Sequence, residues 1–311
     1  MMAAVKARTA QIVGIGACVA DTLWCLPSYP TEDPKARATD VKQAGGGPVA
    51  TGLVAAEKLG AHTAFIGTLA DDASGRFLLS DFEKYGVETD LVRVLSGYRS
   101  FSSVLLLAAD RGTRTCAFDR GDLPPTELNG EQRAAIEAAE LLMVDGNELD
   151  AAVEGARLAR AAGKHVLYDC GGNYPNVSRL LAVADILIPS EEFALAETGC
   201  RTAEEAAHAL LEKYHPAVVV ITQGKRGGIL FDGKTVRSYP CYPAEVVDSN
   251  GAGDVFHGAF AAAMLRGYGF ETCCHFASAT SALKCTGVGA RESVPSFEAV
   301  RNYLRENGYE L

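Results

Sequence analysis

The stretch Val246-Val-Asp-Ser-Asn-Gly-Ala-Gly-Asp-Val-Phe-His-Gly-Ala259 is the most informative part of the 311-residue chain. It predicts a strand that meets a turn of small residues, and this turn opens an apolar, alanine-rich helix. Small residues let backbone approach a ligand closely. The amides of Gly251, Ala252 and Gly253 would then lie at the positive end of the helix and form a nest for phosphate oxygens.

Asp254 directly follows this nest. A carboxylate is unexpected in a site that only binds phosphate. It is useful if it accepts the proton of an attacking hydroxyl while the amides hold the developing negative charge. The alternative is that Asp254 only caps the first helical turn and favours the helix dipole. These residues alone leave both interpretations open.

The same alternation of strand and helix extends outward over the chain. A strand is expected at 11–16, and a helix at 48–59 has Pro48 in its first turn and Gly60 just past its end. Further strands are expected at 63–67, 141–145, 165–169, 186–188 and 217–222. Further helices are expected at 74–85, 151–162, 203–214, 252–266, 271–285 and 296–306. Such alternation predicts a mostly parallel sheet flanked by helices, in one α/β domain over residues 1–311.

Two segments, 17–44 and 98–120, break the alternation. The first has no helical period, and the second contains strand-like runs on either side of Asp110-Arg-Gly-Thr113, which is a hairpin signal. We expect one small antiparallel sheet that stands off the main domain. Such a sheet can close over a substrate as a lid and exclude water. An edge extension of the main sheet is the alternative.

Composition and charge favour a small-molecule partner. The formal net charge is −10 and no Lys/Arg cluster is visible, which argues against nucleic acid or an acidic membrane surface as the partner. No apolar run reaches the roughly 18 residues that span a bilayer, and no signal peptide is evident. The nine cysteines form no C-x-x-C pair, which indicates free thiols in a reducing compartment. A cytoplasmic location is therefore expected.

Two motifs in the right order resemble the signatures of the ribokinase-like (PfkB) carbohydrate kinase family. Asp248-Ser-Asn-Gly-Ala-Gly-Asp254 resembles the second signature, and Gly45-Gly-Gly-Pro-Val-Ala-Thr-Gly52 with the following Ile66-Gly67 resembles the first. Order and spacing agree over essentially the whole chain. The resemblance implies a ribokinase-like α/β fold with a small β lid. It also implies transfer of the γ-phosphoryl group of ATP, with Mg²⁺, to a sugar hydroxyl.

The resemblance also assigns roles around the reacting groups. Asp254 is implied to be the catalytic base, and Gly251, Ala252 and Gly253 the anion hole. Asp21 matches the family aspartate that hydrogen-bonds sugar hydroxyls from the base of the lid. Gly46 and Gly47 match the di-glycine that lets the sugar lie against bare backbone.

Three further residues are candidates on other grounds. Arg120 is a candidate for steadying the transferred phosphoryl group, with a solvated lid arginine as the alternative. Asn147 and Asp169 end predicted strands, where open α/β sheets place ligands, so both are expected to face the cleft. His257 lies one helical turn after Asp254. It is expected to be a packed helix histidine, and a second catalytic group is the alternative.

For the nucleotide, Thr222-Gln-Gly-Lys-Arg-Gly227 matches the family's strand-end Thr-x-Gly-x-x-Gly, so Thr222, Gly224 and Gly227 are implied to lie along ATP. Many members carry Asn-x-x-Glu where this chain has Ser190-Glu-Glu-Phe193. Ser190 is therefore expected at the nucleotide, and Glu192 is the displaced or lost glutamate of indirect magnesium contact. The loop 286–291 is implied to wrap the adenine. With Asp248 and Asn250, it is also implied to hold a monovalent cation such as K⁺.

The substrate is inferred from positions at which this sequence differs from the ribokinase pattern. Ala50 stands where ribokinase has a sugar-binding asparagine, which weakens ribose as the substrate. Tyr29-Pro-Thr-Glu-Asp33 and Ala117-Phe-Asp-Arg120 resemble ketohexokinase and sulfofructose kinase, so a ketose such as fructose is expected. Asn147 and Asp119 argue against a sulfonated sugar. A nucleoside kinase of the same fold is the main alternative, and a homodimer through the lid is expected.

The sequence argues against two other function classes. Gly14-Ile-Gly16 follows a predicted strand but lacks the third small residue of a dinucleotide fingerprint, because Val19 stands there. This argues against a dehydrogenase. A binding protein that keeps the fold without activity is disfavoured by the retention of Asp254 beside the intact Gly-Ala-Gly.

Overall fold

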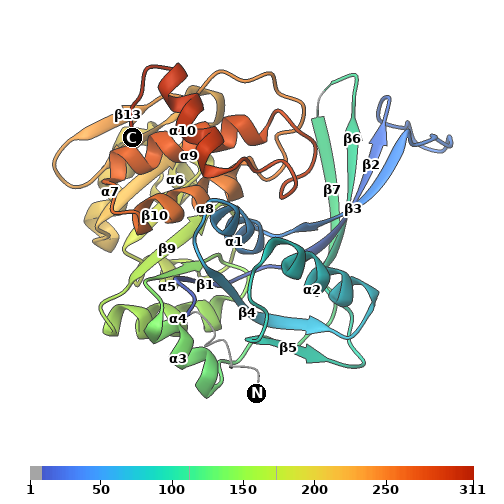
Figure 1. Ribbon diagram of the computed structural model, residues 1–311, viewed down its shortest axis with the longest axis horizontal. Helices are drawn as coiled ribbons and strands as arrows, with labels where there is room; N and C mark the ends of the chain where they lie inside the picture. Colours follow the sequence, from blue (N-terminus) through green and yellow to red (C-terminus); the bar gives the residue numbers. More distant parts are fainter. Residues whose placement is uncertain (1–8, 112, 173) are drawn as a thin grey trace, which may run out of the picture.

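A nine-stranded sheet runs through the middle of the computed structural model, which describes residues 9–111, 113–172 and 174–311 (Figure 1). Its strands, in spatial order, are β13 (Val236–Tyr239), β12 (Gly228–Phe231), β11 (Val218–Thr222), β10 (Ile186–Pro189), β9 (His165–Cys170), β8 (Leu141–Val144), β1 (Ile12–Ile15), β4 (Thr63–Ala70) and β5 (Val92–Leu95). The pairs from β5 to β11 are parallel, and β12 and β13 add two antiparallel strands. The expected mostly parallel sheet is confirmed.

The central strands are apolar on both faces because helices cover both. Every residue of β1 and of β8 is buried. This is typical of parallel strands in the middle of an α/β sheet. Their carboxyl ends meet along one edge of the sheet, so the loops after them converge there.

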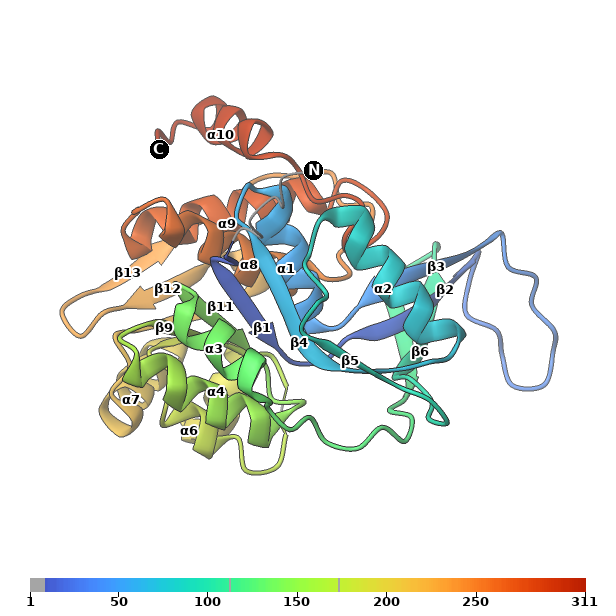
Figure 2. The same cartoon turned by 60° about the horizontal axis from the view of Figure 1, so that its bottom comes forward.

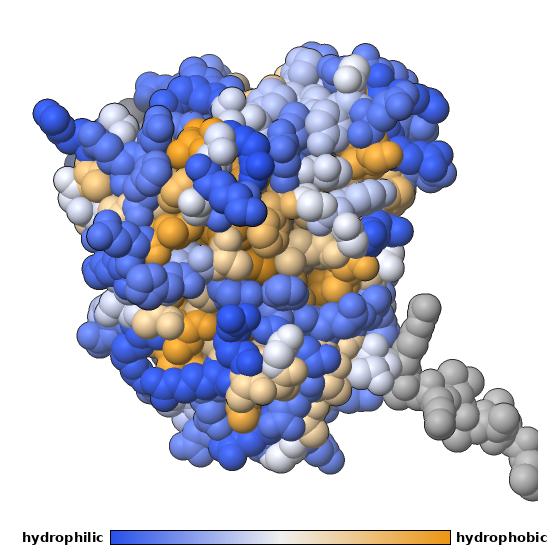
Figure 3. Space-filling view, turned by 90° about the vertical axis from the view of Figure 1, so that its left-hand side faces the viewer, coloured by the Kyte–Doolittle hydropathy of each residue, from blue (hydrophilic) through white to orange (hydrophobic). Residues whose placement is uncertain are grey.

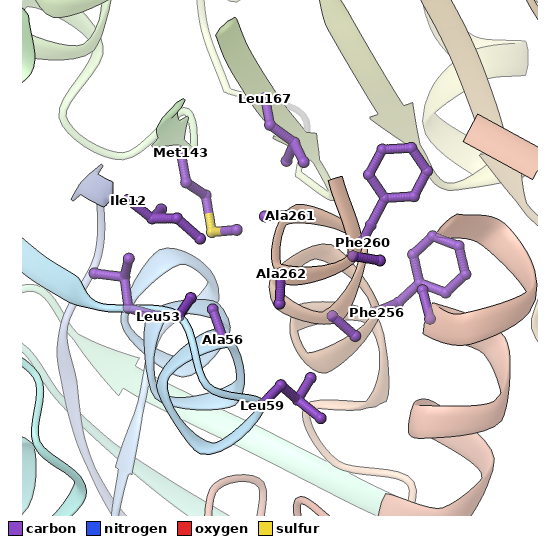
Figure 4. Packing of buried hydrophobic residues seen from close by; sticks show 14 of the residues in the cluster. Ile12, Leu53, Ala56, Leu59, Met143, Leu167, Phe256, Phe260, Ala261 and Ala262 are labelled. Atoms are coloured by element: carbon purple, nitrogen blue, oxygen red, sulfur yellow. The ribbon is translucent and has the colours of Figure 1, made fainter. Parts of the chain in front are cut away.

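Helices form a layer on each face of the sheet (Figure 2). One layer contains α1 (Pro48–Lys58), α2 (Ala73–Tyr85), α8 (Ala252–Leu265), α9 (Phe270–Lys284) and α10 (Phe297–Glu306). The other contains α3 (Gly130–Ala138), α4 (Leu149–Ala161), α5 (Ser178–Leu181), α6 (Glu191–Thr198) and α7 (Ala203–Tyr214). In the first layer, α1 and α8 pack side by side against β1, β8 and β9. Their side chains meet in one cluster that includes Leu53, Met143 and Phe260 (Figure 4).

A separate four-stranded sheet, the lid, stands to one side of the main sheet (Figure 1). Its order is β3 (Asp40–Gly46), β2 (Val19–Leu26), β6 (Ser102–Ala108) and β7 (Thr113–Asp119). These strands come from the segments 17–44 and 98–120, as expected. An edge extension of the main sheet is ruled out.

The expectation that the lid is wholly antiparallel is wrong. The outer pairs are antiparallel, but the central strands β2 and β6 run parallel. The reason is that β2 and β6 both follow strands of the parallel main sheet, so the chain enters the lid twice in the same direction. The β6–β7 ladder is the expected hairpin, although Gly112 of its turn lies outside the described residues.

The strand expected at Val246 is also absent from the described structure. Residues 240–250 form no ladder. The amides of Val247 and Asp248 instead donate to the carbonyl of Cys285 at 2.8 and 3.1 Å. The loop before α8 is therefore tied to the end of α9 and not to a neighbouring strand.

Most of the surface that faces away from the lid is hydrophilic, and apolar side chains gather in a band across its middle (Figure 3). None of the helices within the described ranges is long and apolar enough to cross a membrane. All nine cysteines are free thiols.

Candidate active site

The first turn of α8 is open to a ligand. Gly251 precedes it with φ 72°, and a Cβ atom there would lie 2.5 Å from that of Ala290, so glycine is required on both counts. In the part of the chain that the structure describes, no side chain caps this turn. Of the three amides expected in the nest, that of Ala252 donates to the Ser249 carbonyl at a long 3.3 Å. The turn therefore presents amide donors and the positive end of the helix dipole.

Asp254 lies in this first turn and is half-buried. Loss of surrounding water raises its pKa, and the neighbouring carboxylate of Asp145 raises it further. The positive charges of His257, Arg114 and Arg291 oppose the rise. The raised pKa makes this carboxylate a stronger proton acceptor than an exposed aspartate.

A cavity of about 240 Å³ lies between the lid and the end of the main sheet. We call it the acceptor pocket. Its lining brings together most residues expected at the sugar, with several that were not expected: Asp21, Gly47, Phe101, Ser103, Phe118, Arg120, Asn147 and Tyr174.

Asp21 lines the acceptor pocket from strand β2 of the lid, and the neighbouring lid strand β6 holds its carboxylate in place. The Ser103 hydroxyl donates to its Oδ1 atom at 2.6 Å across the parallel β2–β6 pair. Burial raises the pKa of Asp21 to about 6, and the Ser103 hydrogen bond and Arg291 oppose this rise. Ser103 was not predicted, because only the β2–β6 register places it beside Asp21.

The di-glycine is required by packing as well as by conformation. A Cβ atom on Gly46 would lie 2.0 Å from the Asp21 carboxylate. Gly47 has φ 94°, and its Cβ atom would lie 2.2 Å from the Ala17 carbonyl. Bare backbone at these positions therefore makes room for the Asp21 side chain as well as for a ligand.

Asn147 is fixed by hydrogen bonds on three sides. Its backbone and side-chain amides donate to Asp145 at 2.8 and 3.1 Å, and its side-chain amide contacts the Tyr174 hydroxyl at 3.1 Å. Arg120 donates to the Asn147 backbone and side-chain oxygens at 3.2 and 3.3 Å, and it lies over the Phe101 ring. Arg120 is thus both an exposed lid residue and part of the pocket wall.

Asp145 organises this wall although it was not among the predicted site residues. Besides Asn147, it accepts hydrogen bonds from the amides of Ala17 and Val49 at 2.9 and 3.3 Å. Burial raises its pKa, and these amides oppose the rise. Its position at the end of the strand predicted at 141–145 was the signal available in the sequence.

A second cavity, of about 500 Å³, lies beside the first turn of α8. We call it the nucleotide pocket. Thr222, Gly224 and Gly227 line it as expected, together with Ala252 and Gly253. Its remaining wall is largely apolar and includes Tyr242, Val246, Phe256 and Cys285. This wall suits a flat aromatic base.

Ser190 and its two glutamates lie at the edge of the nucleotide pocket. Ser190 caps α6 and pairs with Thr222 in a β-bridge. Glu192 is exposed. No contact made by Glu192 within the described residues supports its interpretation as the displaced glutamate. Glu191 instead accepts from Gln223 at 2.7 Å and pairs with Arg226, which fixes the turn after β11.

Asp248 ties the loop before α8 to the loop 286–291. Its carboxylate accepts from the amides of Asn250 and Gly289 at 2.8 and 2.9 Å. Its carbonyl accepts from the ammonium group of Lys284 at 2.7 Å, and Lys284 is fully buried. Lys284, which was not predicted, thus brings a positive charge to the region expected to hold K⁺.

Arg291 links this loop to the acceptor side. Its guanidinium pairs with Asp81 of α2 at 2.6 Å and donates to the Gly46 carbonyl at 2.8 Å. Arg291 is fully buried. The loop beside the nucleotide pocket and the di-glycine beside the acceptor pocket therefore share one side chain.

Comparisons with known proteins agree with this geometry. Residues 9–296 match the pfkB family of carbohydrate kinases. The chain is 28% identical to a 5-dehydro-2-deoxygluconokinase of Clostridium perfringens over 85% of each chain. It is 26% identical to ribokinase of Bacillus subtilis over 94% of this chain and 99% of the relative. The structure of Arabidopsis thaliana ribokinase complexed with ribose and ATP superposes with a TM-score of 0.85 at 27% identity, covering 96% of this chain and 99% of that one.

The family match spans nearly the whole described chain, and the fold, the open turn of α8 and the two flanking pockets all agree with it. The chain belongs to the pfkB family of carbohydrate kinases and has their ribokinase-like fold, and it is an ATP-dependent phosphotransferase with an alcohol group as acceptor.

Proposed function

We propose that this kinase transfers the γ-phosphoryl group of ATP to a hydroxymethyl group of a small sugar, with Asp254 as the catalytic base. One observation carries the proposal: the first turn of α8 presents Asp254 and open amides, with the nucleotide pocket beside it and the acceptor pocket next to the lid. Asp254 is close enough to Asp21 for its carboxylate to raise the pKa of Asp21. A sugar on Asp21 therefore lies within reach of Asp254.

The residues divide the chemistry between them. Asp254 accepts the proton of the attacking hydroxyl as its oxygen bonds to phosphorus, which makes the hydroxyl a better nucleophile. The amides at the start of α8 stabilise the negative charge on the phosphoryl oxygens and the departing ADP. Closure of the lid over the sugar expels water, which favours transfer to the sugar over hydrolysis.

Magnesium supplies charge neutralisation on the ATP phosphates when it is bound. Within residues 9–111, 113–172 and 174–311, no group of three or more His, Cys, Asp or Glu side chains is placed to hold a metal. This suits Mg²⁺, which is commonly held by nucleotide phosphates and water with few protein ligands. We propose that Ser190 and Thr222 line the phosphates, with at most an outer, water-mediated contact from the 191–192 pair.

For potassium, we propose a weak site at most. The resemblance implies Asp248 and Asn250 as ligands, but the Asp248 carboxylate accepts hydrogen bonds from two amides and its carbonyl accepts one from Lys284. The Lys284 ammonium supplies the positive charge that a monovalent cation would bring. We therefore expect the enzyme to work without added K⁺.

For the sugar, we propose a ketose of the size of fructose. The acceptor pocket is small, and its polar groups are the carboxylate of Asp21, the amide of Asn147 and the guanidinium of Arg120. Hydroxyl groups can donate to the first and accept from the other two. The relatives matched here are named for ribose and for 5-dehydro-2-deoxygluconate. Both therefore belong in the substrate test, together with a sulfofructose.

A nucleoside is the second candidate acceptor, and one observation favours it. The rings of Phe101 and Phe118 lie 5.8 Å apart at the lid side of the acceptor pocket. Phe118 is 66% exposed, so its ring is free to stack on a base. The sequence alone did not show this aromatic pair.

We further propose a homodimer formed through the lid, in the cytoplasm. Trp24, Val41 and Val104 are 40 to 48% exposed. The strand register places them on the lid face opposite Asp21 and Ser103. A second copy would cover this apolar face. Light scattering of the protein and of a Trp24→Glu variant tests the dimer.

The proposed activity is tested by ADP release with MgATP, with and without K⁺. The acceptors are fructose, other ketohexoses, ribose, 5-dehydro-2-deoxygluconate, sulfofructose and nucleosides. We expect the highest kcat/KM with a ketose. A signal confined to nucleosides would replace the sugar by the second candidate, and turnover with none of these acceptors would contradict the proposal.

A further inference from the structure

His257 has hydrogen-bond acceptors against both of its ring nitrogens. Its Nδ1 atom lies 2.6 Å from the Gly253 carbonyl and 3.1 Å from the Asp169 carboxylate. Its Nε2 atom lies 2.9 Å from the Ile188 carbonyl. The side chain is 5% exposed, and that of Asp169 is 4% exposed. Both residues therefore lie beneath the first turn of α8, away from bulk water.

Carbonyl oxygens only accept hydrogen bonds, so each ring nitrogen must carry a proton to satisfy them. A neutral ring would direct a lone pair at one of the two carbonyls. Protonation of Asp169 does not remove this conflict, because the Gly253 carbonyl would still face Nδ1 at 2.6 Å. The hydrogen-bond geometry thus requires a doubly protonated ring, with Asp169 as its counter-ion.

We propose that His257 is an imidazolium, paired with the Asp169 carboxylate, that holds the catalytic turn in place and keeps Asp254 ionised. The pair acts through the turn and does not touch the substrate, so both are positioning residues. Nδ1 fixes the Gly253 carbonyl in the proposed anion hole, and Nε2 anchors α8 to β10. The expected effect of the pair on the reaction rate rests on the proposed role of Asp254. The protonation state of His257 does not.

The other charges around Asp254 do not make the imidazolium redundant. His257 is the strongest of the groups that lower the pKa of Asp254, and loss of water is what raises it. The other charged groups that interact with Asp254 come from other elements: Asp145 after β8, Asp21 of β2, Arg114 of β7, Lys284 of α9 and Arg291 of the loop 286–291. Only the His257 charge lies on the same helix as Asp254.

The protonation state is measured directly on the unmodified enzyme. In protein labelled with ¹⁵N-histidine, His257 should show two protonated ring nitrogens at pH 7.5, and His257→Gln identifies its signals by their disappearance. The signals of an exposed histidine such as His215 serve as the reference in the same spectrum. A His257 ring with a single proton would overturn the inference whatever the activity of the enzyme.

The effect on catalysis is measured by the acid limb of the kcat profile, at saturating sugar and ATP, in two variants in which a neutral residue replaces a charged one. His257→Gln removes a positive charge and should move the limb to higher pH by at least about half a unit. Asp169→Asn removes a negative charge and should move the limb to lower pH or leave it in place. A purely structural role would lower kcat in both variants without separating their limbs, and this outcome would contradict the proposal.

The two measurements separate failure of this inference from failure of the proposed function. If the ring is doubly protonated but neither variant moves the acid limb, then the limb does not report the ionisation of Asp254. The proposal that His257 keeps Asp254 ionised is then overturned. If the variants do not fold, the ¹⁵N spectrum of the unmodified enzyme still decides the protonation state.

Discussion

The two pockets beside α8 are built in different ways. Backbone and small residues form the phosphate end of the nucleotide pocket, from the turn after β11 to Gly253. Side chains from segments far apart in the chain form the acceptor pocket, and two of its polar groups are held by other side chains: Asp21 by Ser103, and Asn147 by Asp145 and Tyr174. The nucleotide pocket can therefore be inferred from short motifs, whereas the acceptor pocket depends on how distant segments meet.

Asp254 is the proposed proton acceptor, so its replacement should have the largest effect. Asp254→Asn keeps the shape and removes the proton acceptor, and we expect kcat to fall by about a thousandfold or more. ATP affinity measured by calorimetry should stay within a few-fold. Asp90→Asn, at an exposed site far from both pockets, is the control. Near-normal turnover in Asp254→Asn would refute the assignment of the base.

Gly251→Ala tests the backbone-built side. The new Cβ atom would lie 2.5 Å from that of Ala290 at a φ of 72°, so the turn must shift. We expect kcat to fall by about a hundredfold through misplaced amides, and unfolding stability to fall by about 1 to 2 kcal/mol. Gly130→Ala, which has open space around its Cβ position, should change neither. Unchanged kcat in Gly251→Ala would show that these amides do not hold the reacting phosphate.

Gly46→Ala tests the acceptor pocket, which side chains form, in the same way. The added methyl would lie 2.0 Å from the Asp21 carboxylate and displace it from Ser103. We expect the KM for the sugar to rise by about tenfold, which matches the loss of one charge-assisted hydrogen bond. The KM for ATP should be unchanged. Equal changes in both values would mean that the two pockets are not separable.

The pH dependence of sugar binding sharpens the same contrast. The pKa of Asp21 is raised to about 6, so its carboxylate accepts hydrogen bonds from the sugar above that pH and is progressively protonated below it. We expect the KM for the sugar to rise several-fold as pH falls from about 7 to 5.5, with a smaller change for ATP. Asp21→Asn should have a high sugar KM at every pH. A pH-independent sugar KM in the unmodified enzyme would remove Asp21 from the contact.

Potassium should have the smallest effect. Because the Lys284 ammonium already lies against the Asp248 carbonyl, replacing Na⁺ by K⁺ should change kcat by no more than about twofold. Lys284→Met removes the charge at similar volume and should make the rate more dependent on K⁺. Strong activation of the unmodified enzyme by K⁺ would show that a cation binds in addition to Lys284.

The alternation of strands and helices was readable because the central strands are continuously apolar and most of the helices have clear ends. The short helices α5 and α6 and the polar helix α3 were missed, since few of their residues are buried. In the site, the glycines could be placed from their motifs. Ser103, Asp145, Tyr174 and the Phe101–Phe118 pair could not, because their roles arise from strand register and from contacts between segments far apart in the chain.

The parallel pairing of β2 with β6 affects the order in which the chain folds and the way in which segments can be exchanged between relatives. Asp21 and Ser103, which meet across this pair, are 82 positions apart, and the chain between them builds α1, β4, α2 and β5. A hairpin can form locally, but this pair must wait until the intervening segment has folded onto β1. During synthesis, the lid is therefore completed only after α1 and α2 of the first helical layer have emerged. Exchange of substrate preference between relatives must likewise transplant both lid segments together.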